Sequence, residues 1–116
     1  MNGIHGVRDT MIEKTASSAL LELYIPSDCE YYDGHFPEIA VLPAVAQFEL
    51  VIRFAAKYLG TPIAVRRIKR IKFSDIIWPD STVRLHLTYN AEAGLLTFKI
   101  TRRDSDDVHA QGTITL

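Results

Sequence analysis

The chain has 116 residues, of which 47% are hydrophobic and 23% are charged, a balance that is typical of a folded globular protein and excludes a disordered one. Its net charge of −1 disfavours nucleic acid as a partner. The longest run without a charged residue, 39–48, has ten residues, which is about half of what a membrane-spanning helix needs. We therefore expect one domain over residues 1–116 that does not insert into a membrane.

Cysteine and histidine usage indicates a reducing compartment and no metal. The single cysteine, Cys29, excludes a disulfide within the chain. No basic patch followed by an apolar stretch opens the sequence, so we expect no secretory signal and a cytoplasmic location. Apart from one histidine in a loop, the histidines are spread out without the spacing of metal ligands.

Hydrophobic periodicity predicts the elements of the first half of the chain. Residues 1–10 show no clear period and are expected to be loosely held, whereas 11–14 are expected to form a short strand. A turn at 15–18 follows. Alternation then predicts a strand over 19–25 with three apolar side chains on one face, Leu21, Leu23 and Ile25.

A helix is expected over 44–59, because no breaker interrupts this stretch, a proline precedes it and Gly60-Thr61-Pro62 follows it. Most of its residues are apolar. Four polar residues interrupt that character: Gln47, Glu49, Arg53 and Lys57. A single sheet covers only one side of a helix, so the other side needs a partner and we expect a dimer.

The second half of the chain is dominated by strand patterns. Residues 63–73 are β-branched and basic, and the spacing between Ile68 and Ile71 breaks the alternation once, which indicates a strand with a bulge. Cleaner alternation predicts further strands at 82–89, 95–102 and 108–116. His86 and His109 fall on strand faces opposite the apolar residues and are expected at the surface. The fold class is α+β, with a single long helix and an antiparallel sheet.

A basic run follows the predicted helix and gives the two halves of the chain opposite charge. Residues 1–60 have a net charge of −4 and residues 61–116 a net charge of +3. The run consists of Arg66, Arg67, Lys69, Arg70 and Lys72. A solvated strand face is the ordinary interpretation of such a run, and a docking surface for an acidic partner is the alternative.

The stretch 34–49 holds the two side chains best suited to chemistry. His35 lies in a loop that begins with Gly34 and contains Pro37. Glu49, 14 positions further on, lies in the apolar helix, where a carboxylate is rarely placed unless it is paired or used.

The spacing of these residues resembles that of a known family. His35-Phe36-Pro37, five residues, Pro43, five residues and Glu49 follow one another as in the bacterial 3-hydroxyacyl-[acyl-carrier-protein] dehydratases of the hot-dog fold. The segment 71–80 is similar to the strand and turn that follow the helix in that family. The likeness covers about residues 19–116, and the chain looks most like the small dehydratases of accessory fatty-acid and polyene gene sets. It implies a dimeric hot-dog fold, in which a curved antiparallel sheet of five to six strands wraps one long central helix.

The resemblance also implies roles for particular residues. His35 would remove the α-proton of a 3-hydroxyacyl thioester, and the partner subunit's Glu49 would protonate the departing hydroxyl. The backbone N–H of Ala44 would hold the thioester carbonyl, and the Val41 carbonyl would fix the tautomer of His35. Phe36 is interpreted as pocket wall or packing.

The partners implied by the resemblance are an acyl carrier protein and a second hot-dog subunit, identical or related. No cofactor of its own is expected, since the substrate carries the phosphopantetheine of the carrier protein. The docking residues would be four members of the basic run, Arg66, Arg67, Lys69 and Arg70.

The chain departs from the family pattern close to both ends of the motif. Glu38 and Ala44 stand where glycine is usual, Ala40 where proline is usual and Arg53 where glutamine is usual. Ala44 still offers its N–H, but Arg53 lies one helical turn beyond Glu49. An adjacent arginine favours an ionised carboxylate and burial favours a protonated one, and the sequence leaves open which effect dominates.

Three function classes therefore remain after the sequence is considered. The favoured one is a carrier-protein-dependent dehydratase. A hot-dog thioesterase is the second, although the retained His35-Phe36-Pro37 disfavours it. The third is a non-catalytic acyl-binding or carrier-binding subunit, in which Arg53 neutralises Glu49 or forms a purely structural ion pair with it.

Overall fold

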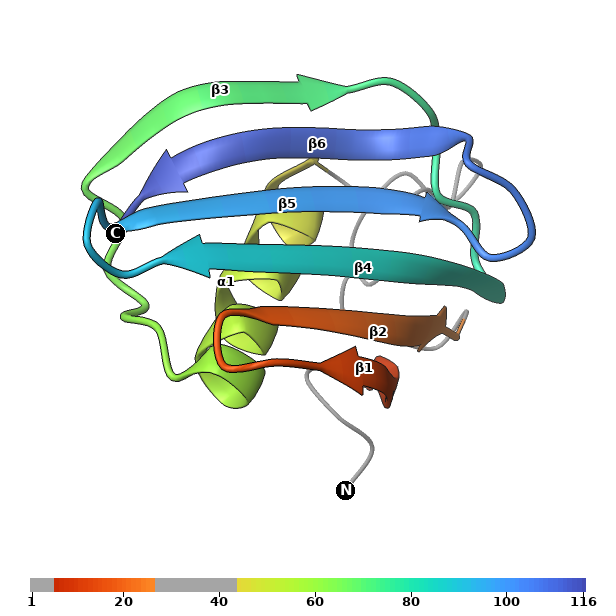
Figure 1. Cartoon of the computed structure of the whole chain (residues 1–116). Helices are drawn as coiled ribbons and strands as arrows, with labels where there is room; N and C mark the ends of the chain where they lie inside the picture. The colour runs from red at the N-terminus through yellow and green to blue at the C-terminus, as the bar shows by residue number, and fades with distance from the viewer. Residues whose placement is uncertain (1–5, 27–43) are drawn as a thin grey trace.

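The computed structural model describes residues 6–26 and 44–116 and contains one helix and six strands within them. The elements are β1 (Arg8–Lys14), β2 (Ser18–Ile25), α1 (Ala44–Leu59), β3 (Arg67–Phe73), β4 (Ser81–Asn90), β5 (Leu95–Arg102) and β6 (Val108–Thr115). The strands form one antiparallel sheet in the order β1-β2-β4-β5-β6-β3, which curves across α1 (Figure 1). The predicted hot-dog architecture is confirmed.

The core lies between the inner face of the sheet and the helix. Alternate side chains of the central strands are buried there, as their sequence pattern predicts. From the strands, the core includes Leu21, Leu23, Ile25, Val83, Leu85, Leu87, Leu96, Phe98 and Ile100. The helix contributes Leu50, Val51 and Phe54, which are almost fully enclosed. Burial of each such side chain stabilises the fold by about 1.5–3 kcal/mol.

The bounds of α1 agree with the predicted ones. Its end is closed by Gly60, whose φ of 67° lies in the left-handed region and whose N–H donates to the Ala56 carbonyl at 3.0 Å. Gln47, one of the polar residues that interrupt the helix, is buried. Val45, in contrast, is 80% exposed at the start of the helix.

The expectation of a loosely held segment up to residue 10 is wrong for its described part. β1 begins at Arg8, and Val7 is fully buried. Backbone pairing with β2 orders this segment, and such pairing needs no side-chain period. The carboxylate of Asp9 is also tied to the helix, since Lys57 Nζ donates to it at 2.6 Å and the Tyr58 hydroxyl donates to the same oxygen.

The ionisation of these groups follows from that contact. Burial and the neighbouring Asp9 carboxylate raise the pKa of Tyr58 to about 12. Burial raises the pKa of Asp9, but the hydrogen bonds from Lys57 and Tyr58 outweigh it and the net pKa lies below the ordinary value. Asp9 is therefore an ionised anchor between β1 and the end of α1.

The predicted bulge in the basic strand is confirmed. The register of β3 against β6 shifts between Ile68 and Arg70, so Lys69 is the extra residue. The strand is shorter than expected, since it begins at Arg67 and not at residue 63. Within the described ranges, no helix is long and apolar enough to cross a membrane.

Candidate functional site

Glu49 lies on the side of α1 that turns away from the core. Its side chain is 37% exposed, so the expectation of a carboxylate enclosed by apolar residues is wrong. Arg53 Nε donates to Glu49 Oε1 at 2.7 Å, because a spacing of four residues places the two on the same helical face. The ion pair that the sequence left open therefore exists in the structure.

This ion pair contributes little to the stability of the fold. The Arg53 side chain is half exposed, and exposed pairs at this helical spacing are worth about 0.3–0.5 kcal/mol. Solvent and dissolved ions screen such a pair, and each of its two side chains can leave the pair to form another contact. The carboxylate is thus accessible to a ligand or to a second subunit.

The amino end of α1 lies close to Glu49 in the sequence and is a candidate site for a carbonyl oxygen. Ala44 is the first helical residue and is exposed. The N–H groups of a first helical turn have no acceptor within the helix, and the aligned peptide dipoles give this end a partial positive charge. Ala44 is therefore placed as the carbonyl-binding role requires, and that role stays a prediction.

The remaining predicted members of the catalytic loop lie outside the described residues. These are His35, Phe36 and Val41. Their assigned roles as base, pocket wall and tautomer-fixing carbonyl stay predictions.

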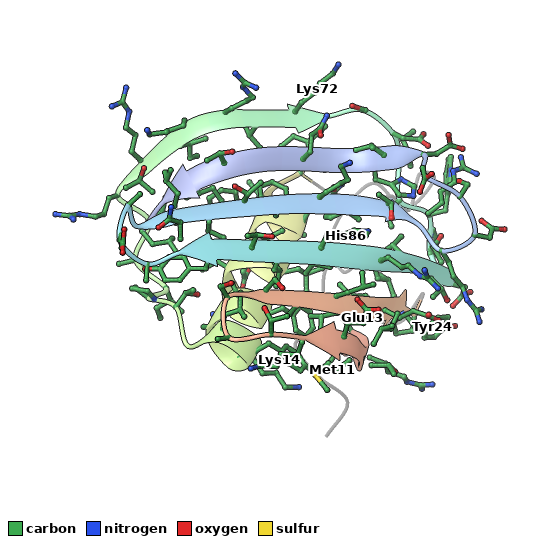
Figure 2. All side chains as sticks on the ribbon, in the orientation of Figure 1. Met11, Glu13, Lys14, Tyr24, Lys72 and His86 are labelled. Atoms are coloured by element: carbon green, nitrogen blue, oxygen red, sulfur yellow. The ribbon has the colours of Figure 1, made fainter. Side chains whose placement is uncertain are left out.

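The basic run lies along one edge of the sheet. Among the described strands β3 pairs only with β6, and its pairing places Arg70 opposite Thr113 and Lys72 opposite Gln111. Ile71, between them, pairs with Gly112 on the inner side, so Arg70 and Lys72 project outward, as Figure 2 shows for Lys72. All five cations are exposed, and none forms an ion pair with another residue of the described ranges.

The two strand histidines differ in their surroundings. His86 is exposed on β4, as predicted, and its Nε2 lies 3.2 Å from Thr101 Oγ1 (Figure 2). The same prediction is wrong for His109, which is only 6% exposed. Consecutive residues Ile100 and Thr101 of β5 pair with Ala110 and Val108, so His109 is the extra residue of a bulge. A bulge re-aims its side chain, and here the imidazole turns inward.

An acidic and a basic side chain accompany the buried imidazole. Asp75 Oδ2 lies 3.9 Å from His109 Nδ1 and accepts a hydrogen bond from Arg102 Nη2 at 3.1 Å. The Arg102 guanidinium holds the pKa of Asp75 below its ordinary value. Burial lowers the pKa of His109 below 6.5, with Arg102 acting in the same direction and Asp75 opposing.

This burial predicts an acid-sensitive contribution to stability. The unfolded chain protonates His109 near pH 6.5, whereas the folded chain resists protonation until a lower pH. Stability is therefore full above pH 6.5 and falls as the pH drops towards the folded pKa. We expect the free energy of unfolding, measured in urea at pH 7.5 and 5.5, to fall less in His109→Gln than in the natural protein. Equal losses in both proteins would contradict this expectation.

No group of three or more histidine, cysteine, aspartate or glutamate side chains that could hold a metal ion occurs among the described residues. The exposed Glu49 carboxylate and the N–H groups at the amino end of α1 are the described parts of the site.

The family model of the ApeI-like dehydratases, described as ApeI dehydratase, matches residues 11–113 of the chain. The chain belongs to the ApeI-like dehydratase family. Among curated protein sequences, none matches it.

Solved structures agree with the family assignment of this ApeI-like dehydratase. The dehydratase heterocomplex ApeI:P from Xenorhabdus doucetiae contains a chain that is 28% identical, with a TM-score of 0.79 over 93% of this chain and 96% of that one. An uncharacterized protein from Erwinia carotovora subsp. atroseptica is 27% identical, with a TM-score of 0.71 over 92% and 94% of the two chains.

More distant structures share the fold alone. Thioesterase superfamily member 2 from Mus musculus is 12% identical, with a TM-score of 0.71 over 91% of this ApeI-like dehydratase and 78% of the thioesterase. Dehydratases and thioesterases are thus built on the same framework, and the family match, rather than the fold, separates them. The chain is a dehydratase of the hot-dog type.

Proposed function

We propose that this ApeI-like dehydratase converts a 3-hydroxyacyl thioester on acyl carrier protein into the 2-enoyl thioester. The observation that carries the proposal is the family match over 11–113, which includes the whole His35-to-Glu49 motif. The partly exposed Glu49 carboxylate and its position in the helix whose first residue is Ala44 support it.

The proposed reaction assigns one task to each group. His35 takes the α-proton, and the electrons of the broken C–H bond move towards the thioester carbonyl as enolate charge. The Ala44 N–H, at the positive end of the helix dipole, stabilises that charge. Glu49 then protonates the 3-hydroxyl, the C–O bond breaks and water leaves, because hydroxide itself is a poor leaving group.

A site shared between two subunits is part of the proposal. Val45 on the helix and Ile68 and Phe73 on the edge strand β3 are exposed apolar side chains that a second subunit would cover. The ApeI:P structure is described as a dehydratase heterocomplex. By analogy, the second subunit here is either a further copy of this chain or a related hot-dog chain.

A product analysis tests the proposed reaction against the two other classes. The protein, alone and with a candidate second subunit, is incubated with a 3-hydroxyacyl carrier-protein thioester, and the products are identified by mass spectrometry. Loss of one water supports the dehydratase, and release of the free acid would identify a thioesterase. Unchanged substrate under both conditions would favour a non-catalytic subunit, the candidate that the 2.7 Å Glu49–Arg53 pair supports.

The basic run on β3 predicts a dependence on the carrier protein. Reversing two exposed charges, Arg66→Glu with Arg70→Glu, is expected to lower kcat/KM for a carrier-bound substrate about tenfold at low salt, because such charges mainly speed encounter with an acidic partner. A small pantetheine-type thioester should be turned over as before. Steady-state kinetics on both substrates provides the measurement.

A matched control exists on the opposite edge of the sheet. Arg8→Glu with Lys14→Glu makes the same change in net charge on β1, and both side chains are exposed there. We expect this double variant to have an unchanged kcat/KM for both substrates. Equal losses from the β1 and β3 reversals, or equal losses on both substrates, would exclude docking on β3.

A further inference from the structure

A hollow of about 430 Å³ lies on the outer face of the sheet, and three adjacent strands, β5, β6 and β3, each contribute two side chains to it. In the register of the strands these six residues form two rows: Thr97, Thr113 and Arg70 in the first, and Lys99, Gln111 and Lys72 in the second. The middle strand, β6, supplies the two uncharged members that lie between the cations. The outer hollow therefore has cations along its rim and hydrogen-bonding groups on its floor.

The rim of the outer hollow carries three positive charges. Arg70, Lys72 and Lys99 are all exposed, and none of them forms an ion pair with a described residue. Neighbouring strands lie about 5 Å apart, so the cations of β5 and β3 are about 10 Å apart at their backbones. Like charges that gather on one sheet face repel one another, and an anion bound among them would remove that cost.

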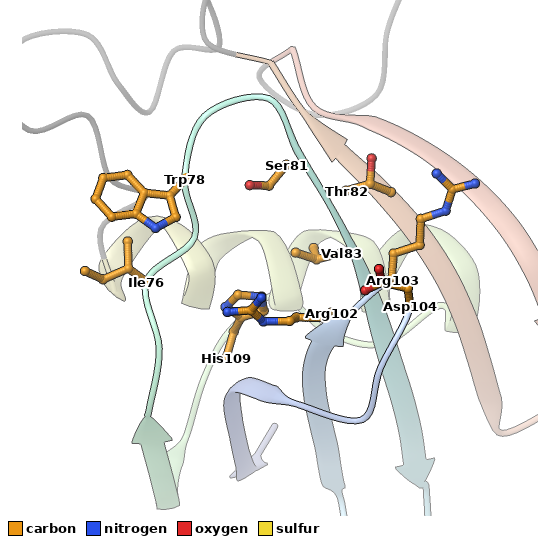
Figure 3. A pocket seen from close by; sticks show the side chains of 9 residues that line it. All are labelled: Ile76, Trp78, Ser81, Thr82, Val83, Arg102, Arg103, Asp104 and His109. Atoms are coloured by element: carbon orange, nitrogen blue, oxygen red, sulfur yellow. The ribbon is translucent and has the colours of Figure 1, made fainter.

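A cavity beside the turn between β5 and β6 shows a different treatment of cations (Figure 3). There Arg102 is paired with Asp75 at 3.1 Å, and Arg103 is paired with Glu22 at 3.2 Å. Those guanidinium groups are neutralised by carboxylates of the same chain. The described lining of the outer hollow contains no acidic residue, so the counter-charge for its cations has to come from a molecule in solution.

The histidine next to the outer hollow responds to its positive charge. His86 on β4 pairs with Lys99 on β5, and its side chain lies on the same outer face as Lys72 (Figure 2). Burial lowers the pKa of His86, and the positive charges of Lys99 and Arg84 lower it further, while Asp106 opposes them. On the other side, β2 places the uncharged Leu20 opposite His86. An anion bound at Lys99 would therefore raise the pKa of His86.

We propose that the outer hollow binds a phosphate group, with Lys99, Lys72 and Arg70 as its charged partners and the residues of β6 as hydrogen-bond donors. A phosphate has several acceptor oxygens and can contact cations that approach from two sides, whereas a carboxylate has two oxygens in one plane. The flexible stems of lysine and arginine are long enough to converge over the middle strand.

Two sources supply this chemistry: free phosphate, and the phosphate of a phosphopantetheine arm. The second source rests on the proposed function, whereas binding itself needs neither Glu49 nor turnover. A failure of the phosphate site would therefore leave the dehydratase proposal untouched, and the reverse also holds.

Binding is measured at pH 7.5 from the backbone amide resonances of the intact protein in NMR spectra. Inorganic phosphate, phosphopantetheine, pantetheine and acetate are titrated separately at one ionic strength, set with sodium chloride, so that general screening stays constant. We expect saturable shifts at Thr97, Lys99 and Gln111 with both phosphate compounds, and at least fivefold weaker binding of acetate. Tighter binding of phosphopantetheine than of inorganic phosphate, with none of pantetheine, identifies the arm as the source. Equal or weaker binding of phosphopantetheine identifies free phosphate.

Two outcomes of these titrations would overturn the proposal. One is the absence of a saturable shift with inorganic phosphate and with phosphopantetheine. The other is equal binding of acetate and phosphate, which would instead indicate a surface for the carboxylates of an acidic protein.

Exposed substitutions test the location of the site. Lys99→Gln is expected to weaken phosphate binding about tenfold, the low end of what the loss of a hydrogen bond to a charged group costs. Lys14→Gln removes the same charge from β1, at the opposite edge of the sheet, and should bind phosphate normally. Unchanged binding in Lys99→Gln, or equal weakening in both variants, would exclude the outer hollow as the site.

The ring of His86 provides a second readout, which a loss of folding would not imitate. Its resonance is identified by its absence from His86→Gln, and its titration is followed with sulfate, which keeps two negative charges throughout. At constant ionic strength, sulfate should raise the pKa of His86 in the natural protein and in Lys14→Gln, but not in Lys99→Gln. The same rise in all three proteins would contradict binding at Lys99.

Discussion

Replacing Glu49 by glutamine is expected to lower kcat for dehydration by about 10²–10⁴-fold, which is the usual loss when a positioned general acid is removed. Glutamine has the shape of glutamate but cannot deliver a proton to the leaving hydroxyl. The folded structure should be unaffected, because the exposed pair with Arg53 contributes little to stability. Single-turnover kinetics with a carrier-bound 3-hydroxyacyl thioester, together with circular dichroism, provides the measurement.

Arg53→Gln separates the catalytic role from a structural one. This variant breaks the same 2.7 Å ion pair from its other side but keeps the carboxylate. If Glu49 acts as the acid, Arg53→Gln retains activity while Glu49→Gln loses it. If the two variants behave alike, the pair is structural and the acid role of Glu49 must be abandoned.

Mixing two inactive variants extends this test to the second subunit. His35→Ala is also expected to be inactive, and hybrid dimers of His35→Ala with Glu49→Gln would contain one intact site if the site is shared. Some activity should therefore return after subunit exchange. An inactive mixture in which exchange has been demonstrated would contradict a shared site within a homodimer.

The fold was predictable from the sequence because its signals are local. The alternation in β2 and β4 places apolar side chains on one face, and the breakers around α1 define its two ends. Even the bulge in β3 was visible, because Ile68 and Ile71 are both apolar and three residues apart. Each of these signals lies within the element that it describes.

The features that were missed depend on a neighbouring strand. In β6, Val108 and Ala110 keep a regular alternation around His109, so nothing in that strand reveals the bulge. Its position is set by the register of β5, which the sequence of β6 does not contain. β1 was likewise underestimated at its start, because pairing with β2 orders Arg8 and the residues after it through the backbone.

The exposure of Glu49 was missed for a different reason. An apolar helix with one carboxylate predicts burial only if something covers every side of it, and the sheet covers one. The sequence therefore identified Glu49 and its ion-pair partner Arg53, but it did not show which surface faces them. A second subunit, which the sequence predicts and the single chain does not contain, is what would change that surface.

Gly112→Ala is expected to lower the free energy of unfolding by about 2–3 kcal/mol, a large effect for a single methyl group. A Cβ at this position would lie 2.6 Å from the Arg70 carbonyl oxygen and 2.8 Å from Cε1 of Phe98. Neither neighbour can move easily, since one is the backbone of β3 and the other is a buried ring of the core. The close approach of β5, β6 and β3 therefore requires glycine, and the methyl group would push the basic edge strand away.

Gly60→Ala is the matched control, because a Cβ there has open space and only its φ of +67° is unfavourable. Its cost should be about 1–2 kcal/mol, the strain of a left-handed residue. Urea denaturation of both variants at pH 7.5 measures the difference. The Gly112 variant should also lose more turnover of the carrier-bound substrate than its unfolded fraction accounts for, since β3 presents the basic run. The Gly60 variant should show no such additional loss. Equal stability losses in the two variants would mean that the strands around Gly112 accommodate a side chain, and that their packing does not hold β3 in place.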